Sequence, residues 1–217
     1  MNSDQTTFRG SMPEQRHVGV LVFDEAEVLD VAGPFEVFSI AGRRSGIQPF
    51  NVSLVGIGPG PVTMRSGFMV EPKYTIHTVP HMDVLLIPGG YGTRRELDNH
   101  ALLGWIRSRA ADAELLLSVC TGSLLLGKAG LLDGMAATTH HGALDLLKEL
   151  APSTRVDGRE RFIDNGKVIT AAGVSAGVDM ALHVVERLLG EDLAVEAAHY
   201  MEWHWDRSVD ELPDQGV

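Results

Sequence analysis

The chain has 217 residues, of which 44% are hydrophobic and 22% charged, and this composition fits one compact α/β domain. The formal net charge of −11 repels a phosphate backbone and disfavours nucleic acid as a direct partner. One cysteine cannot form an internal disulfide, which favours the reducing cytoplasm. The first 16 residues contain no signal-peptide core, and no apolar run of roughly eighteen residues predicts a membrane helix.

Short apolar runs alternate with amphipathic stretches, the pattern of a parallel sheet covered by helices on both faces. In chain order, the predicted strands are 17–23, 50–58, 83–90 and 114–119, followed by a hairpin of 160–164 with 167–171 around Asn165 and Gly166. The predicted helices are 31–43, 101–113, 121–132, 142–152, 177–190 and 192–205, and residues 62–79 are predicted to be an irregular excursion with short strands. We expect a disordered extension at 1–16, a single domain at 17–205 and an acidic, frayed tail at 206–217.

The single cysteine, Cys120, lies between a predicted strand and a predicted helix. Its side chain should emerge at the carboxyl edge of the sheet, where open α/β folds bind ligands. The free N–H groups of a helix N-terminus favour a thiolate over a thiol, so we predict a reactive nucleophile. The alternative is an ordinary buried cysteine that packs as a small hydrophobe.

A glycine loop at Gly89 and Gly90 closes the strand before this turn. The backbone N–H of Gly90, with that of Thr121, is predicted to stabilise negative charge developing beside the sulfur. The alternative is that the two glycines only turn the chain.

Four segments together resemble the ThiJ/PfpI superfamily, whose members are class I glutamine amidotransferase-like: VLDVAGPFEV (28–37), LLIPGGYG (85–92), SVCTGSLLLGKAGLL (118–132) and ATTH (137–140). The resemblance covers nearly all of residues 17–205 and is strongest to the isocyanide (isonitrile) hydratases. It implies a flavodoxin-like three-layer α/β/α sandwich with a mostly parallel sheet and a nucleophile elbow, usually in a homodimer.

The resemblance also implies roles for individual residues. Cys120 falls on the family nucleophile and Asp30 on the carboxylate beside it, where most of the superfamily has Glu and isocyanide hydratases have Asp. Thr121 falls on the Thr that follows their cysteine, and Gly90 on the glycine of the oxyanion loop. A carboxyl group among apolar neighbours should have a raised pKa, which suits proton transfer. The alternative for Asp30 is a helix N-cap ahead of Pro34.

The sequence departs from the hydratase pattern at the rim of the predicted site. His141 stands where those enzymes have Trp, and the glycine loop carries a polar, basic set of residues: Tyr91, Thr93, Arg94 and Arg95. These departures make a charged or polar small-molecule substrate conceivable.

Two competing motifs are weighed against this interpretation. Residues 173–177 match G-x-S-x-G with Ser175 at its centre, but only helices and a tail follow, so we interpret the glycine pair as a close contact between helix and sheet. His199 and His204 are five apart and do not form a metal pair on one helix face. His140 stands where glyoxalase-type members of the superfamily complete a triad.

The function that the resemblance implies, and with which these residues are consistent, is cysteine-dependent hydration of an isocyanide to an N-substituted formamide, with no metal or organic cofactor. One alternative is glyoxalase III or deglycase-like action on 2-oxoaldehydes with Cys120, Asp30 and His140. Another is a non-enzymatic ligand or redox sensor related to the sensor domains of AraC-type regulators. Those regulators continue into a helix-turn-helix domain, so a sensing role would need a separate partner here. We predict small-molecule binding by residues around Cys120: Gly89, Gly90, Tyr91, His140 and His141.

Overall fold

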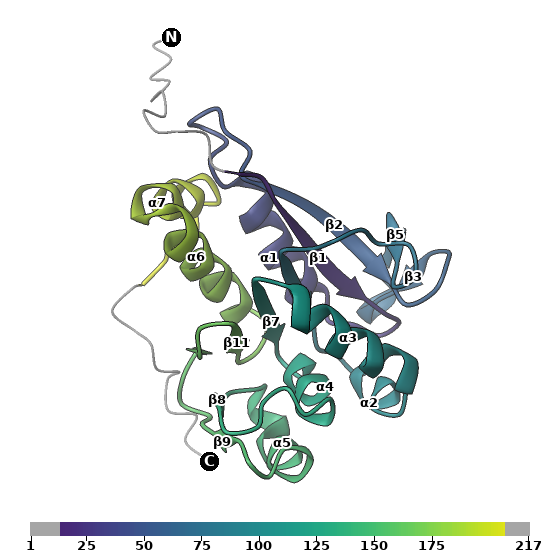
Figure 1. Ribbon diagram of the computed structural model, residues 1–217. Coiled ribbons are helices and arrows are strands. Elements are labelled where there is room, and N and C mark those ends of the chain that lie inside the picture. Colours follow the sequence, from purple (N-terminus) through teal and green to yellow (C-terminus); the bar gives the residue numbers. More distant parts are fainter. Residues whose placement is uncertain (1–13, 207–217) are drawn as a thin grey trace.

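A central seven-stranded sheet organises the computed structural model, which describes residues 14–206 (Figure 1). All neighbouring strands are parallel except β10, which runs antiparallel to β11. The strands, in the spatial order of the sheet, are β10 (Phe162–Asp164), β11 (Val168–Ala171), β7 (Leu115–Val119), β6 (Val84–Ile87), β1 (Arg16–Val22), β2 (Phe50–Gly56) and β5 (Tyr74–Thr75). The prediction of a mostly parallel sheet is confirmed.

Helices cover both faces of this sheet and complete the three-layer sandwich (Figure 1). One layer consists of α1 (Val28–Ile40), α6 (Ala176–Leu189) and α7 (Glu191–Tyr200), which contact one another. The other layer consists of α2 (Thr93–Glu96), α3 (His100–Asp112), α4 (Gly122–Lys128) and α5 (Leu144–Leu150). Within residues 14–206, no helix is long and apolar enough to cross a membrane.

Two small sheets lie outside the central one. The strands β3 (Val62–Thr63) and β4 (Met69–Val70) pair antiparallel around the short helix η1 (Arg65–Gly67), as the predicted excursion at 62–79 requires. The strands β8 (Ala136–Ala137) and β9 (Arg155–Val156) pair only with each other, and the short helix η2 (His141–Ala143) lies between them in the chain. The segment between α4 and α5 therefore does not add a strand to the central sheet.

The buried core explains why the parallel strands are so apolar. Every residue of β6, β7 and β11 is buried, because helices cover both faces of these strands. A Cβ added at Gly177 would lie 2.9 Å from the side chain of Val119, so α6 approaches β7 closely. The interpretation of the glycine pair as a close contact between helix and sheet is confirmed for Gly177 only, because a Cβ at Gly173 would lie 2.8 Å from the ring of His140.

The boundaries of the first helix differ from the prediction. Helix α1 begins at Val28, three residues before the predicted start, and Pro34 lies inside it and not in its first turn. Arg16 already belongs to β1, while residues 1–13 of the predicted extension and 207–217 of the predicted tail lie outside the described residues. The four-residue helix α2 was not predicted.

Candidate active site

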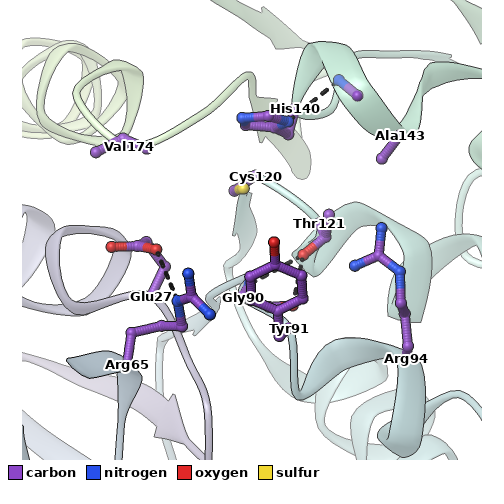
Figure 2. Close-up of a pocket in the computed structure, with 11 residues that line it drawn as sticks. Glu27, Arg65, Gly90, Tyr91, Arg94, Cys120, Thr121, His140, Ala143 and Val174 are labelled. Atoms are coloured by element: carbon purple, nitrogen blue, oxygen red, sulfur yellow. Dashed lines mark hydrogen bonds and ion pairs between the residues drawn. The ribbon is translucent and has the colours of Figure 1, made fainter. Parts of the chain in front are cut away.

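A cavity of about 380 Å³ opens at the carboxyl edge of the sheet, and Cys120 lines it (Figure 2). The parallel strands β6 and β7 end here, so the loops that follow them meet at one place. The residues lining the cavity are Glu27, Arg65, Gly90, Tyr91, Arg94, Cys120, Thr121, His140, Gly142, Ala143 and Val174.

The backbone at Cys120 is held in an unusual conformation. Its φ of 56° lies in the left-handed region, which side chains other than glycine rarely adopt. The carbonyl oxygen of Cys120 accepts hydrogen bonds from the hydroxyls of Thr139 at 2.9 Å and Ser123 at 3.2 Å, and its N–H donates to Ala171 at 3.1 Å. These contacts fix the turn between β7 and α4 and direct the thiol toward the cavity.

Asp30 is fully buried beside this turn. One carboxyl oxygen accepts the N–H of Gly89 at 3.0 Å, and the other accepts the N–H of Val174 at 3.1 Å. The N-cap alternative for Asp30 is wrong, because Glu27 occupies the N-cap position and Asp30 lies inside α1. Its carboxyl group therefore joins three separate segments of the chain next to Cys120, and it does not itself line the cavity.

Burial raises the pKa of Asp30 to about 7, although the N–H groups of Gly89 and Val174 favour its charged form. This confirms the raised pKa predicted from its apolar neighbours. Near neutral pH the carboxyl group therefore exists in both protonation states, which lets it accept and donate protons.

The thiol of Cys120 behaves differently from the prediction. Burial, together with the negative charge of Asp30, raises its pKa to about 12. The expectation that the helix N-terminus favours the thiolate is wrong for the resting site, since the N–H of Thr121 only partly offsets burial. The carboxyl group of Asp30 acts on the thiol, because its charge is one of the causes that raise the thiol pKa, so an acceptor for the thiol proton lies nearby.

The glycine loop is hydrogen-bonded to Thr121, because the N–H of Gly90 donates to the Thr121 hydroxyl at 2.9 Å. The role of this N–H in stabilising negative charge beside the sulfur stays a prediction. The Thr121 hydroxyl lies 3.0 Å from that of Thr93 and 3.2 Å from the Gly90 carbonyl oxygen. Thr121 thus holds the loop in place, while its own N–H faces the sulfur.

His140 lines the cavity, and His141 packs on it with ring centroids 4.1 Å apart. The Nδ1 atom of His140 accepts the N–H of Gly142 at 3.1 Å, so its ring proton is placed on Nε2 in the neutral form. Burial and the neighbouring charges of His141 and Arg94 lower the pKa of His140. Among the hydrogen bonds found for residues 14–206, none joins His140 to Cys120 or Asp30.

Only two of the four residues predicted for the polar, basic rim line the cavity. Tyr91 and Arg94 line the cavity, whereas Thr93 is buried and Arg95 donates to the carbonyl oxygen of Asp24 at 3.1 Å, beside a second cavity. Gly89 and His141 support the site without lining it.

Six residues of the site were not predicted from the sequence: Glu27, Arg65, Thr139, Gly142, Ala143 and Val174. Glu27 and Arg65 form one wall of the cavity (Figure 2). The hydroxyl of Thr139 donates a hydrogen bond to the carbonyl group of Cys120. The matching motif ATTH contains Thr139, but nothing local indicates its partner. Arg65 is supplied by the irregular excursion, where no periodic pattern exists to place it.

Ser175 does not line the cavity. Its hydroxyl lies 3.4 Å from Nη2 of Arg161, which is itself paired with Asp179. A serine nucleophile needs a base within hydrogen-bonding reach, and an arginine cannot serve as one. The G-x-S-x-G match therefore forms the strand-to-helix turn that carries the N–H of Val174 to Asp30.

With this geometry in place, comparison with known proteins identifies the family. The DJ-1/PfpI family matches residues 16–187, and the chain belongs to this family. It is 37% identical over 177 residues to the isonitrile hydratase of Pseudomonas putida, a match that covers 82% of this chain and 74% of that protein. It is also similar to the crystal structure of a ThiJ/PfpI family protein from Pseudomonas syringae, with a TM-score of 0.82 and 29% identity, covering 100% of this chain and 84% of that one.

Transcriptional regulators are also among its relatives. The HTH-type transcriptional regulator GbdR of Pseudomonas aeruginosa is 27% identical over 193 residues, which is 87% of this chain and 52% of that protein. The chain therefore spans about half the length of that regulator. The family to which it belongs includes both enzymes and regulators.

Proposed function

We propose that the protein hydrates an isocyanide to an N-substituted formamide, with Cys120 as nucleophile and Asp30 as acid and base. The observation that carries the proposal is the thiol of Cys120, which lines the cavity and has the buried carboxyl group of Asp30 beside it, in a chain 37% identical to an isonitrile hydratase. An aspartate at this position agrees with the hydratases, whereas most of the superfamily has glutamate.

The first half of the reaction uses the proton of the Cys120 thiol, with Asp30 as its acceptor. As the sulfur of Cys120 bonds to the terminal isocyanide carbon, the ionised Asp30 accepts the thiol proton and passes it to that carbon. The product of this step is a thioimidate in which the former thiol hydrogen is bonded to carbon. Because the resting thiol is protonated, proton transfer accompanies the attack and does not precede it.

The second half consumes water. Asp30 accepts a proton from a water molecule that adds to the thioimidate carbon, and the nitrogen gains a proton. Collapse of the adduct breaks the carbon–sulfur bond, releases the formamide and returns the proton to the thiol. The overall change is the addition of one water to the isocyanide, which needs neither a redox partner nor a Lewis acid.

The experiment is turnover of aryl and alkyl isocyanides, followed by formamide formation, for the wild type, Cys120→Ala and Ser175→Ala. We expect Cys120→Ala to lose turnover by a factor of at least 10³ and Ser175→Ala to retain it. Thermal unfolding of each variant controls for folding. Turnover by Cys120→Ala at the wild-type rate, or none by the wild type, would refute the proposal.

A sensor role is the second candidate, favoured by the similarity to GbdR across most of the chain. It predicts saturable binding of a small molecule without turnover.

The glyoxalase-like alternative predicts turnover of methylglyoxal that depends on His140. His140→Ala should reduce isocyanide hydration far less than 2-oxoaldehyde turnover, because His140 has no hydrogen bond to the thiol in the described part of the chain. The proposal also includes a homodimer, which light scattering tests.

A further inference from the structure

The charged side chains of the cavity are distributed unequally between its two sides. Glu27 and Arg65 lie on one side of the opening, and Arg94 extends along the other side, beside Thr121 (Figure 2). Besides His140, whose pKa is lowered, the lining residues that carry a formal charge are Glu27, Arg65 and Arg94. The lining therefore has a net positive charge within a chain whose formal net charge is −11.

The positive charge of Arg65 is already compensated. Its guanidinium lies 4.0 Å from the carboxylate of Glu27 and 3.8 Å from that of Glu25, and it stacks 4.0 Å above the ring of Tyr91. These neighbours provide two negative charges and an electron-rich ring face.

Arg94 has no such compensation. Among the ion pairs of residues 14–206, none joins Arg94 to a carboxylate, and its guanidinium is 6.0 Å from the ring centroid of Tyr91. The charge of Arg94 affects another residue of the cavity lining, because it contributes, after burial and His141, to lowering the pKa of His140. A guanidinium at the rim of a cavity with low-dielectric walls attracts anions, and its planar fork matches a carboxylate.

We propose that the substrate carries a carboxylate, which Arg94 binds at the rim while the reacting group meets Cys120 at the floor. This inference rests on the proposed isocyanide hydration and names its substrate class. An isocyanide group is linear, so a substrate whose terminal carbon faces the sulfur directs its substituent away from the floor. A carboxylate at the far end of that substituent lies where Arg94 extends.

The test compares two substrates of similar size, 4-isocyanobenzoate and the neutral 4-isocyanobenzamide. We expect the wild type to have a kcat/KM at least fivefold higher for the carboxylate. Arg94→Gln should lower the ratio of the two kcat/KM values about fivefold, and Arg94→Lys should retain part of it because the charge stays while the fork is lost. Higher salt should reduce the wild-type preference, since the rim is solvent-accessible.

The matched control is Arg107→Gln, which removes the same charge from an exposed position on α3 outside the cavity. It should leave the substrate preference at the wild-type value. If Arg107→Gln lowers the preference as much as Arg94→Gln does, the effect is one of net charge and the inference is overturned.

A binding measurement separates this inference from the proposed function. Calorimetry with the stable products, 4-formamidobenzoate and 4-formamidobenzamide, reports Arg94 without requiring turnover. Isocyanide turnover without carboxylate preference overturns the inference and leaves the proposed function standing. Absence of turnover, with formamidobenzoate binding that Arg94→Gln weakens, refutes the proposed function and supports a carboxylate site. If the wild type shows neither isocyanide turnover nor formamidobenzoate binding, both the inference and the proposed function are overturned.

Discussion

Replacing Asp30 by Asn should change how the stability of the protein depends on pH. In the folded protein the pKa of Asp30 is about 7, whereas the ordinary value is 3.8. Between these values the folded chain keeps the proton and the unfolded chain has released it. Raising the pH through this window therefore favours the unfolded state, and the free energy of unfolding falls.

The magnitude follows from the difference between the two pKa values. The interval spans about three pH units, and each contributes ~1.4 kcal/mol, so the full loss is about 4 kcal/mol and is complete above pH 7. From pH 5 to pH 8 the loss is roughly 2.5 kcal/mol. The Asp30→Asn variant cannot ionise at this position, so the substitution removes this dependence. The amide that replaces the carboxyl group offers one acceptor oxygen, so one of the two N–H donors loses its partner, which costs about 1–3 kcal/mol at every pH.

The assay is urea unfolding of wild type and Asp30→Asn at several pH values between 5 and 8. As the pH rises from 5 to 8, the free energy of unfolding of the wild type should fall relative to that of Asp30→Asn. Asp98→Asn, at an exposed position between α2 and α3, is the control and should keep a constant difference from the wild type. If the wild type and Asp30→Asn also differ by a constant amount across this range, the carboxyl group is not held with a raised pKa and the reasoning fails.

Three further outcomes are expected. The kcat/KM for an isocyanide should rise with pH and level off above about 7, because only ionised Asp30 accepts the thiol proton; a profile that falls through this range contradicts the proposed role. Thr139→Val should lower the free energy of unfolding by about 1–2 kcal/mol in urea titrations, because the Cys120 carbonyl loses a buried hydrogen bond. Gly90→Ala should lower the melting temperature strongly, because its φ is 124° and a Cβ would lie 2.3 Å from the Glu25 carbonyl oxygen, whereas Gly104→Ala, in open space on α3, should raise the free energy of unfolding by roughly 0.5–1 kcal/mol.

The sequence is sufficient for the parts of the structure that depend on local patterns. The mostly apolar run at 114–119 identifies β7, because a strand buried on both faces is built largely from apolar residues. Asn165 and Gly166 identify the turn between β10 and β11 because that dipeptide suits a tight hairpin. The position of Cys120 between strand and helix follows from the apolar run of β7 and from the predicted helix at 121–132.

The remaining features depend on contacts between distant segments. The hydrogen bond from the N–H of Val174 to Asp30 joins residues far apart in the chain, and no periodicity of the sequence predicts it. Arg65 reaches the cavity from an excursion of very short strands, which lack a repeating pattern. The pKa of Cys120 was predicted with the wrong sign because the helix N-terminus is visible in the sequence, while the burial that outweighs it depends on the whole fold.

The two hydrogen bonds to Asp30 have a consequence for how this site can diversify. The carboxyl group that transfers protons also secures the loops carrying Gly89 and Val174, so selection cannot alter its chemistry without disturbing the architecture. Tyr91 and Arg94 are exposed at the mouth of the cavity, and neither side chain secures two loops by hydrogen bonds as Asp30 does. Descendants of this protein can therefore acquire new substrates by exchanging mouth residues while the reactive floor stays the same.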